Sequence, residues 1–404
     1  MKRLIWFSDS ILITTGYGKI GMEVLQGLHK KGYESVNVPK SGFMGKTIDL
    51  GFTSLVSVSE NNSFDMMAVQ AKLFQPDYIV MMVDIWAYNI AELRKMIPKS
   101  VIISYLPVDT DGLPMGTSEQ LEYIDYIIPM SKHAEKLLKE KVSEEKLIDV
   151  IYPPIPECFK FNADQQGKRD RLGFYGYDRV VTMVQMLRDL VRKDQIRQFM
   201  AVRDAAEKTG LKVGIYAHMV PSKKLDLKVI AREIGFEDIR HAMPDAYLAG
   251  FTDEQMAEIY NVSDLVLQCT MGEGWGMPTG ESILCGTPVV GVKNTATEEL
   301  VEGSWPEYAV EAKELQMLNI APSYIASYDD MVDKIAMALT EAKKDPERGE
   351  NLRELTHPDF VIGQWIKAFE EVDRRFEVAC KAPPELGSEL IANADMSQII
   401  EVKK

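Results

Sequence analysis

Two carboxylates and a cluster of glycines occupy residues 269–281 (CTMGEGWGMPTGE) of this chain of 404 residues. Glu273 and Glu281 stand eight positions apart, with Gly274 and Gly276 between them. The sequence is apolar and strand-like on both sides, so this segment should form a turn and a helix start between two strands. Backbone N–H groups at such a turn can bind phosphate, and carboxylates accept hydrogen bonds from ribose or sugar hydroxyls. The segment therefore predicts a site for a nucleotide sugar.

The same residues resemble the signature of retaining glycosyltransferases with the GT-B fold, E-x7-E within EGFG-P-x-x-E-A-x-x-x-G-x-P-V-V. The matching positions are Glu273, Gly274, Trp275 in place of the usual aromatic residue, Gly276, Pro278, Glu281, Gly286, Pro288, Val289 and Val290. The resemblance is strongest over about residues 247–299 and extends over nearly the whole chain.

This resemblance implies a role for each part of the signature. Glu281 would accept hydrogen bonds from the ribose hydroxyls of the donor, and Glu273 would contact a hydroxyl of the transferred sugar and face the reacting carbon. The backbone amides of Gly274, Trp275, Gly276 and Met277, which precede Pro278, would donate to the sugar or the diphosphate. The simpler interpretation, an acid near a helix N-terminus, accounts for Glu281 but for neither Glu273 nor the glycines.

Three cations follow a predicted strand that ends near residue 186. The family places an arginine there and a lysine five residues later on the diphosphate, and Arg188 and Lys193 have this spacing. Arg192 and Lys193 also match an arginine–lysine pair of some branches. Such cations would neutralise the charge that builds up on the leaving diphosphate. The alternative is an exposed, charged helix start.

A G-x-G-x-x-G pattern at residues 16–21 follows the first predicted strand. It is typical of dinucleotide sites, but a nicotinamide site also needs an acid at the end of the second strand. The corresponding run, residues 35–40 (SVNVPK), has none. The resemblance instead implies a glycine loop, with Gly16 and Gly18, that closes over the donor phosphate. A simple tight turn remains the alternative.

Residues 105–112 (YLPVDTDG) contain a D-x-D pattern that resembles the metal-binding motif of GT-A glycosyltransferases. The E-x7-E signature belongs to the other fold, which needs no metal, so we expect no metal site. Asp109 is expected to line the acceptor side of the cleft, unless the two acids only cap a turn before Pro114. The histidine that many family members carry after the fourth strand is absent, and Asp84 or Asp109 would replace its contact.

Strands and helices alternate in two series separated by a proline-rich linker at residues 152–157 (YPPIPE). Continuous apolar runs predict buried parallel strands. They lie at residues 4–7, 78–83, 101–105 and 126–129, then 180–186, 212–217, 247–248, 265–267 and 289–292. Helices are expected at residues 18–31, 132–141, 195–209 and 360–376.

This pattern predicts an α/β protein of GT-B architecture, with two doubly wound, Rossmann-like domains that face a central cleft. We expect an acceptor-side domain at residues 1–153, completed by a returning helix at about 358–378. A donor-side domain would span residues 154–357, and residues 379–404 form a tail without an assigned role.

The formal net charge of −15 disfavours non-specific attraction to nucleic acids or anionic membranes. No run approaches the roughly 20 apolar residues of a membrane-spanning helix, and the N-terminus reads as a strand rather than a signal peptide. Four scattered cysteines indicate a reducing compartment, so a cytoplasmic protein is expected.

The resemblance implies a retaining, metal-independent glycosyltransferase with no cofactor beyond its donor, a nucleotide diphosphate sugar of the UDP or GDP type. The acceptor stays open among saccharides, lipids, small molecules and modified DNA bases, and the oligomeric state is not indicated. A nucleotide-sugar isomerase of the 2-epimerase type and a non-catalytic nucleotide-sugar-binding protein are the alternatives.

Overall fold

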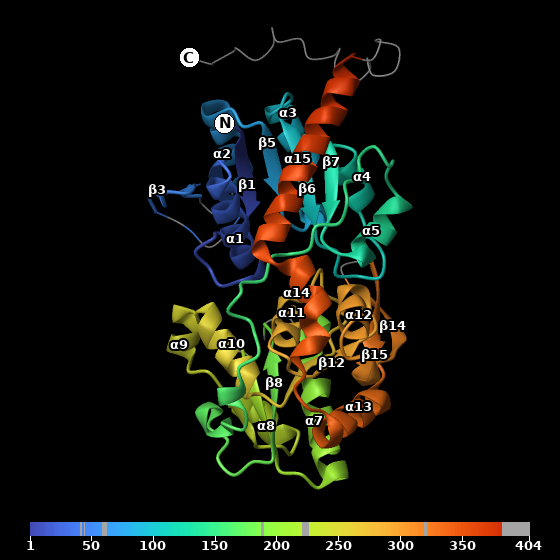
Figure 1. Cartoon of the computed structure of the whole chain (residues 1–404). Coiled ribbons are helices and arrows are strands. Elements are labelled where there is room, and N and C mark those ends of the chain that lie inside the picture. Colours follow the sequence, from blue (N-terminus) through green and yellow to red (C-terminus); the bar gives the residue numbers. More distant parts are fainter. Residues whose placement is uncertain are drawn as a thin grey trace.

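The computed structural model describes residues 1–40, 43, 45–58, 63–186, 190–219, 226–318 and 321–381. Arg188 and the tail beyond residue 381 lie outside the described residues. Two parallel sheets, each flanked by helices, form two halves of the molecule that face each other (Figure 1). The central strands of both sheets are buried along nearly their whole length, as expected of strands covered on both faces.

The N-terminal half contains a seven-stranded sheet in the order β3-β4-β2-β1-β5-β6-β7, in which only β3 is antiparallel to its neighbour. Its strands are β1 (Arg3–Ser8), β2 (Glu34–Pro39), β3 (Ile48–Asp49), β4 (Ser54–Leu55), β5 (Tyr78–Met81), β6 (Val101–Leu106) and β7 (Tyr126–Pro129). Its helices are α1 (Gly16–Lys30), α2 (Ser63–Phe74), α3 (Ile90–Met96), α4 (Thr117–Leu121) and α5 (Lys132–Lys139).

The C-terminal half contains a six-stranded parallel sheet in the order β10-β9-β8-β11-β12-β13. Its strands are β8 (Arg179–Val184), β9 (Val213–His218), β10 (Ile239–His241), β11 (Leu265–Gln268), β12 (Val289–Val292) and β13 (Ala309–Val310). The helices are α6 (Leu190–Lys193), α7 (Gln195–Thr209), α8 (Leu227–Glu233), α9 (Pro244–Ala249), α10 (Asp253–Val262), α11 (Met277–Leu284), α12 (Thr295–Glu302), α13 (Tyr328–Glu341) and α14 (Glu350–Thr356). A separate antiparallel hairpin joins β14 (Ala312–Leu318) to β15 (Ala321–Ala326).

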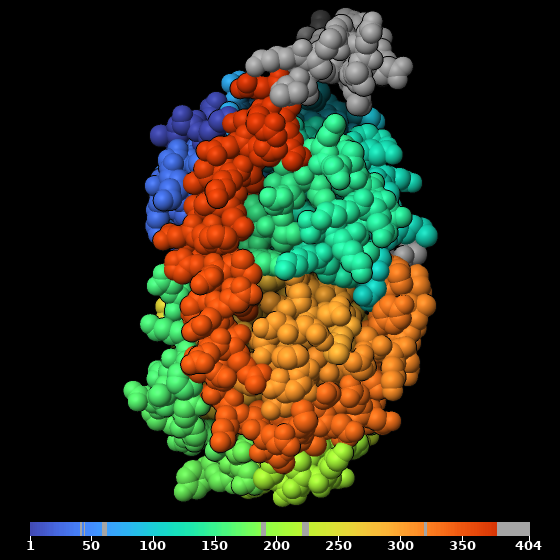
Figure 2. All heavy atoms as spheres, turned by 45° about the vertical axis from the view of Figure 1, so that its right-hand side comes forward, coloured from blue at the N-terminus to red at the C-terminus, as the bar shows by residue number. Residues whose placement is uncertain are grey.

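The last helix, α15 (Pro358–Lys381), leaves the C-terminal half and packs on the N-terminal sheet (Figure 1). Trp365 meets Trp6 edge to face at 5.6 Å, and Phe369 stacks on Tyr78 at 4.5 Å between ring centroids. Figure 2 shows α14 and α15 as a ridge along one side of the molecule, from the C-terminal half to the N-terminal half. The expected helix at residues 360–376 therefore exists and covers the first sheet.

The prediction of a strand at residues 247–248 is wrong. Tyr247 and Leu248 lie in α9, which starts at Pro244, where the fixed φ of proline suits the first helical turn. The edge strand of this sheet is β10, three residues that include Arg240 and His241. Such an edge strand is partly exposed and carries polar residues, so its sequence lacks the continuous apolar run.

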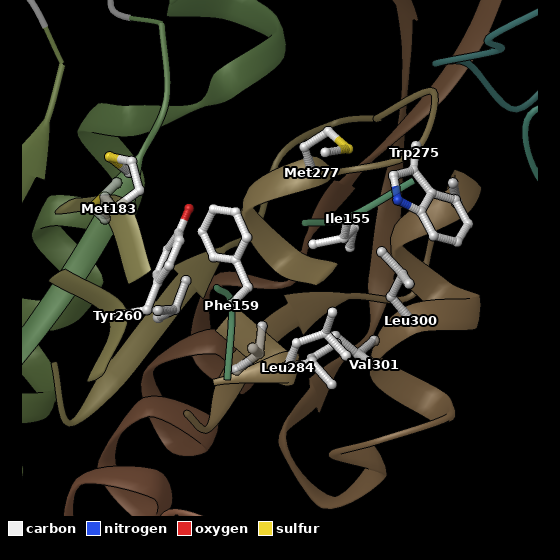
Figure 3. Packing of buried hydrophobic residues seen from close by; sticks show 14 of the residues in the cluster. Ile155, Phe159, Met183, Tyr260, Trp275, Met277, Leu284, Leu300 and Val301 are labelled. Carbon is white, nitrogen blue, oxygen red and sulfur yellow. The ribbon is translucent and has the colours of Figure 1, made fainter. Parts of the chain in front are cut away.

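The proline-rich linker is fixed against the helix that carries Glu281. Ile155, between two of the prolines, and Phe159, just after the linker, are 2% and 0% exposed. Figure 3 shows both side chains within the cluster that contains Tyr260, Trp275 and Met277. A Cβ at Gly280 of α11 would lie 2.8 Å from Cδ1 of Ile155, so the linker touches the backbone of α11. This contact ties the position of the site helix to the linker between the halves.

Candidate active site

Glu281 lies in the second turn of α11 and is 3% exposed. The preceding turn needs a glycine at Gly276, because its φ of +90° is strained for residues with a Cβ. The Tyr260 hydroxyl donates a hydrogen bond of 2.7 Å to Oε2 of Glu281. Burial raises the pKa of Glu281, and the nearby ammonium of Lys19 offsets only part of that rise. The protein thus holds a buried carboxyl group in one orientation at the cleft.

Lys19, from the glycine pattern of the N-terminal half, reaches across the cleft to this carboxylate. Its Nζ lies 2.5 Å from Oδ1 of Asp253 and 3.7 Å from Oε1 of Glu281. Burial lowers the pKa of Lys19, but the two carboxylates more than offset this and leave the pKa above its ordinary value. Sequence reasoning missed Lys19 and Asp253. The only signal was the position of Lys19 inside the G-x-G-x-x-G pattern.

The glycine loop is shaped by its own packing as well as by the opposite half. Thr15 caps α1 by accepting a hydrogen bond of 3.0 Å from the Gly18 N–H. A Cβ at Gly18 would lie 2.2 Å from the carbonyl oxygen of Ile13, so only glycine fits there. A Cβ at Gly16 would lie 3.8 Å from Cγ of Met277 in α11. The loop therefore sits directly over the helix that carries Glu281.

Replacing Lys19 with methionine should destabilise the protein by about 1–3 kcal/mol, because two carboxylates would be left facing each other without their cation. Chemical denaturation of variant and parent measures this. Lys2→Met is the control, since Lys2 pairs with Asp77 and Asp373 at a more exposed place and should cost less than about 1 kcal/mol. If Lys19→Met is no less stable than Lys2→Met, the contact across the cleft contributes nothing.

Glu273 forms the second carboxylate of the site, together with two of the predicted cations. Nζ of Lys193 lies 2.5 Å from its Oε1, and Nη1 of Arg192 lies 3.5 Å from its Oε2. Thr270 donates a further hydrogen bond of 3.0 Å to Oε1. Burial by itself raises the pKa of Glu273, but Lys193 and Arg192 outweigh it and hold the pKa below its usual value. Glu273 is thus an ionised group between two cations.

The backbone around Glu273 is held in an unusual conformation. Thr295, the first residue of α12, accepts the Glu273 N–H at 3.0 Å with its hydroxyl. Its φ is +46°, which is strained for a β-branched residue. Asp194, directly after Lys193, also has a φ of +46°. Strained residues on both sides of the Glu273–Lys193 pair are typical of a preorganised site.

Asp109 approaches the same cluster from the N-terminal half. Its Oδ2 lies 3.5 Å from Nε of Arg192, while its Oδ1 is buried and has no hydrogen-bond partner among the described residues. Burial raises the pKa of Asp109 to about 6, and Arg192 limits the rise. His133 Nε2 lies 2.8 Å from the carbonyl oxygen of Thr110 and supports this loop. Asp109 is therefore a carboxyl group poised to gain or lose a proton near neutral pH.

Asp84, the other candidate to replace the missing histidine, lies close enough to Asp109 for its charge to raise the pKa of Asp109. The Tyr17 hydroxyl donates a hydrogen bond of 2.9 Å to Oδ1 of Asp84. Burial raises the pKa of Tyr17 well above its ordinary value, and the charges of Asp84 and Asp109 add to the rise. Tyr17 belongs to the glycine pattern, so this segment reaches Asp84 through Tyr17 and both Asp253 and Glu281 through Lys19.

Gly274 of the signature and Gly272, two residues before it, allow the halves to touch. A Cβ at Gly272 would lie 2.0 Å from the carbonyl oxygen of Asp109, and one at Gly274 would lie 2.6 Å from Cβ of Pro107. From the sequence, the backbone amide of Gly274 is expected to donate a hydrogen bond to the ligand. The structure adds that Gly272 and Gly274 permit the approach of the opposite half, which brings Asp109 to Arg192.

Gly272→Ala should therefore push the two halves apart. We expect a loss of about 1–3 kcal/mol in stability, typical of an added methyl group in a packed contact, and a larger radius of gyration by small-angle scattering. Gly363→Ala is the matched control, because a Cβ there meets nothing within 4 Å and alanine favours the helix. Equal scattering curves for Gly272→Ala and the parent would contradict this prediction.

The predicted residues thus fall into two neighbouring groups. Glu273, Arg192, Lys193 and Asp109 form one, and Glu281 of α11 with Gly16 and Gly18 the other. Trp275 is 3% exposed, and its ring packs against Tyr152 at 4.6 Å, so its side chain supports the turn from inside. Arg188 is a predicted site residue outside the described part of the chain.

Across the described residues, no group of three or more histidine, cysteine, aspartate or glutamate side chains is arranged to hold a metal ion. No helix in the same part of the chain is long and apolar enough to cross a membrane.

Comparison with known proteins places this geometry in context. No protein-family model matches the chain. One curated relative is similar in sequence, the D-inositol 3-phosphate glycosyltransferase of Mycobacteroides abscessus, at 24% identity over 180 residues. The match covers 44% of this chain and spans 38% of the length of that relative.

Solved structures match along nearly the whole chain. The sucrose-phosphate synthase of Thermosynechococcus elongatus has a TM-score of 0.71 at 12% identity, covering 93% of this chain and 100% of that one. The α,α-trehalose 6-phosphate synthase of Burkholderia multivorans has a TM-score of 0.67 at 14% identity, covering 95% and 99%. Anabaena HepE in complex with UDP has a TM-score of 0.64 at 14% identity, covering 92% and 100%. The resemblance to GT-B glycosyltransferases that the sequence predicted is thus confirmed at the level of the fold: this chain has the GT-B fold.

Proposed function

We propose that this protein is a retaining, metal-independent glycosyltransferase that moves a sugar from a nucleotide diphosphate sugar to an acceptor hydroxyl. The observation that carries this proposal is the contact of Glu273 with Arg192 and Lys193, next to the turn that leads to Glu281. Residues 154–357 would bind the donor. Residues 1–153, together with the returning helix at about 358–378, would bind the acceptor.

In the proposed reaction each group has a distinct task. The ribose hydroxyls of the donor would reach Oε1 of Glu281 beside Lys19. The ammonium of Lys193 and the guanidinium of Arg192 would stabilise negative charge on the leaving diphosphate, at a place already organised before the donor binds. Glu273 would accept a hydrogen bond from the sugar and keep both cations in position.

The reaction would pass through an oxocarbenium-like transition state. The leaving phosphate would accept the proton of the acceptor hydroxyl on the same face of the sugar, so no side chain needs to act as a general base. Closure of the glycine loop over α11 would exclude water, which otherwise hydrolyses the donor. The UDP bound to one structural neighbour makes uridine diphosphate sugars the first donors to try, followed by guanosine diphosphate sugars.

Calorimetric binding and thermal shift against nucleoside diphosphates and their sugars, without added metal, test this proposal. We expect one nucleotide to stabilise the protein selectively, and NMR of the product to show an unchanged anomeric configuration. A donor consumed without any acceptor, and converted to an epimer, would instead favour the isomerase. If no nucleotide or nucleotide sugar of the panel binds or stabilises the protein, the proposed donor site is wrong.

A further inference from the structure

An open cavity of about 520 Å³ lies at the surface of the N-terminal half, between the segment that follows β5 and the helix α4. Its volume falls within the range of roughly 300–1,000 Å³ that is usual for small-molecule sites. Trp86 and Tyr88 line it from the first segment, and Tyr123 lines it from the residues after α4. None of the roles assigned above uses these side chains.

Hydrogen bonds hold the two walls of this cavity together. The Ile90 N–H donates to Oε1 of Gln120 at 2.7 Å and so joins the start of α3 to α4. Arg94 donates to the carbonyl oxygen of Tyr123 at 2.9 Å and to Asp125 at 2.7 Å. The cavity is therefore formed before any ligand binds, which lowers the entropic cost of binding.

The cavity lies beside Asp84. Its Trp86 and Tyr88 follow Asp84 in the chain, and Asp84 is the carboxylate bound by Tyr17. The Tyr88 ring is fixed edge-on against Phe7 at 5.7 Å. Burial raises the pKa of Tyr88 to about 12, and the charges of Asp84 and Asp9 add to the rise. A ligand in the cavity would thus lie next to Asp84, on the N-terminal side of the cleft.

The chemistry of the lining identifies the class of ligand. Aromatic rings pack against the apolar C–H face of a pyranose, and amide and carboxylate groups bind its hydroxyls. Asn89, Gln120, Glu119 and Glu122 supply such groups, and no lysine, arginine or histidine is among the described residues of the lining. The two glutamates would repel a phosphorylated ligand, and this mostly polar lining offers little apolar surface to a hydrocarbon chain.

We propose that this cavity is an acceptor subsite for a neutral, unphosphorylated saccharide, whose ring lies against Trp86. This inference rests on the proposed function, since it names the acceptor class of that same site.

Intrinsic fluorescence offers a test that does not depend on turnover. Trp6, Trp275, Trp305 and Trp365 are at most 3% exposed, whereas Trp86 is only half-buried and lines the cavity. Titration with glucose, galactose, mannose, maltose and sucrose should change the emission of the parent protein for at least one of them. The same titration of Trp86→Phe should show no such change, and glucose 6-phosphate should produce none in either protein.

Turnover with the best saccharide completes the test. Trp86→Ala should raise the KM for that acceptor about tenfold, while nucleotide binding and acceptor-free donor hydrolysis stay at parental values. Tyr175→Ala is the control for loss of an aromatic side chain, because Tyr175 is 87% exposed. Circular dichroism checks that both variants fold.

The outcomes separate this inference from the proposed function. A preference for phosphorylated acceptors, an unchanged KM in Trp86→Ala, or no response to any saccharide would overturn the acceptor subsite while donor binding persists. If the parent protein itself binds no nucleotide sugar, the proposed function is wrong instead.

Discussion

Lys193→Ala is expected to lower turnover about 100- to 1,000-fold, the effect of removing one preorganised charge donor from a transition state. In the structure Nζ of Lys193 lies 2.5 Å from Glu273, in a partly buried place where charge is weakly screened. If the ammonium stabilises the leaving diphosphate, its loss should lower kcat far more than donor affinity. Steady-state kinetics together with calorimetric donor binding measure the two effects separately.

A donor without a diphosphate sharpens this experiment. The negative charge of 4-nitrophenolate is spread over its ring and nitro group instead of phosphate oxygens, so the deficit of Lys193→Ala should shrink with a 4-nitrophenyl glycoside. Lys208→Ala is the matched control, because Lys208 forms an exposed ion pair with Asp333. Turnover near the parental value in Lys193→Ala would refute the role on the diphosphate and leave Lys193 only as the partner of Glu273.

Glu281→Gln is expected to weaken nucleotide diphosphate binding about 10- to 100-fold, since hydrogen bonds to a charged group contribute roughly 1.5–3 kcal/mol. Glutamine keeps the size of the side chain and can still accept the hydrogen bond of Tyr260, so the packing of α11 should persist. Calorimetry with the nucleotide that stabilises the parent protein gives the affinity, and thermal denaturation without ligand checks the fold.

Glu298→Gln serves as the control for charge, because Glu298 is exposed on α12. This variant also removes one negative charge, but at a position other than Glu281, and should leave the affinity for the nucleotide unchanged. An unchanged affinity in Glu281→Gln as well would remove the ribose assignment, even if the protein still binds nucleotides.

The fold was predictable where burial left a strong pattern. Strands such as β5 and β6 are covered on both faces, so they read as continuous apolar runs. The edge strand β10 was missed because an edge needs no such run, and α9 was mistaken for a strand because its apolar pair was read without the effect of Pro244. A hydrophobicity pattern identifies a strand reliably when both faces of the strand are buried. It does not identify a strand that is partly exposed at the edge of a sheet.

The pairing of Glu273 with Lys193 shows how distant residues can be anticipated. The two lie 80 positions apart, but each follows a strand, β11 or β8, and these strands are neighbours in the sheet. The carboxyl ends of adjacent parallel strands meet at one edge, so side chains just beyond them converge. The sequence therefore predicted that Glu273 and Lys193 belong to one site, although they are far apart along the chain.

The sequence by itself determined the alternation of strands and helices, the two-part organisation and the acidic signature with its cations, because each of these depends on local periodicity or short spacing. Only the tertiary structure decided that Lys19 meets Asp253 and that Gly272 touches Asp109. These contacts depend on how two separately folded sheets are placed against each other. That placement arises from the returning helix α15, the buried linker and shape complementarity across the cleft, and no local sequence pattern encodes it.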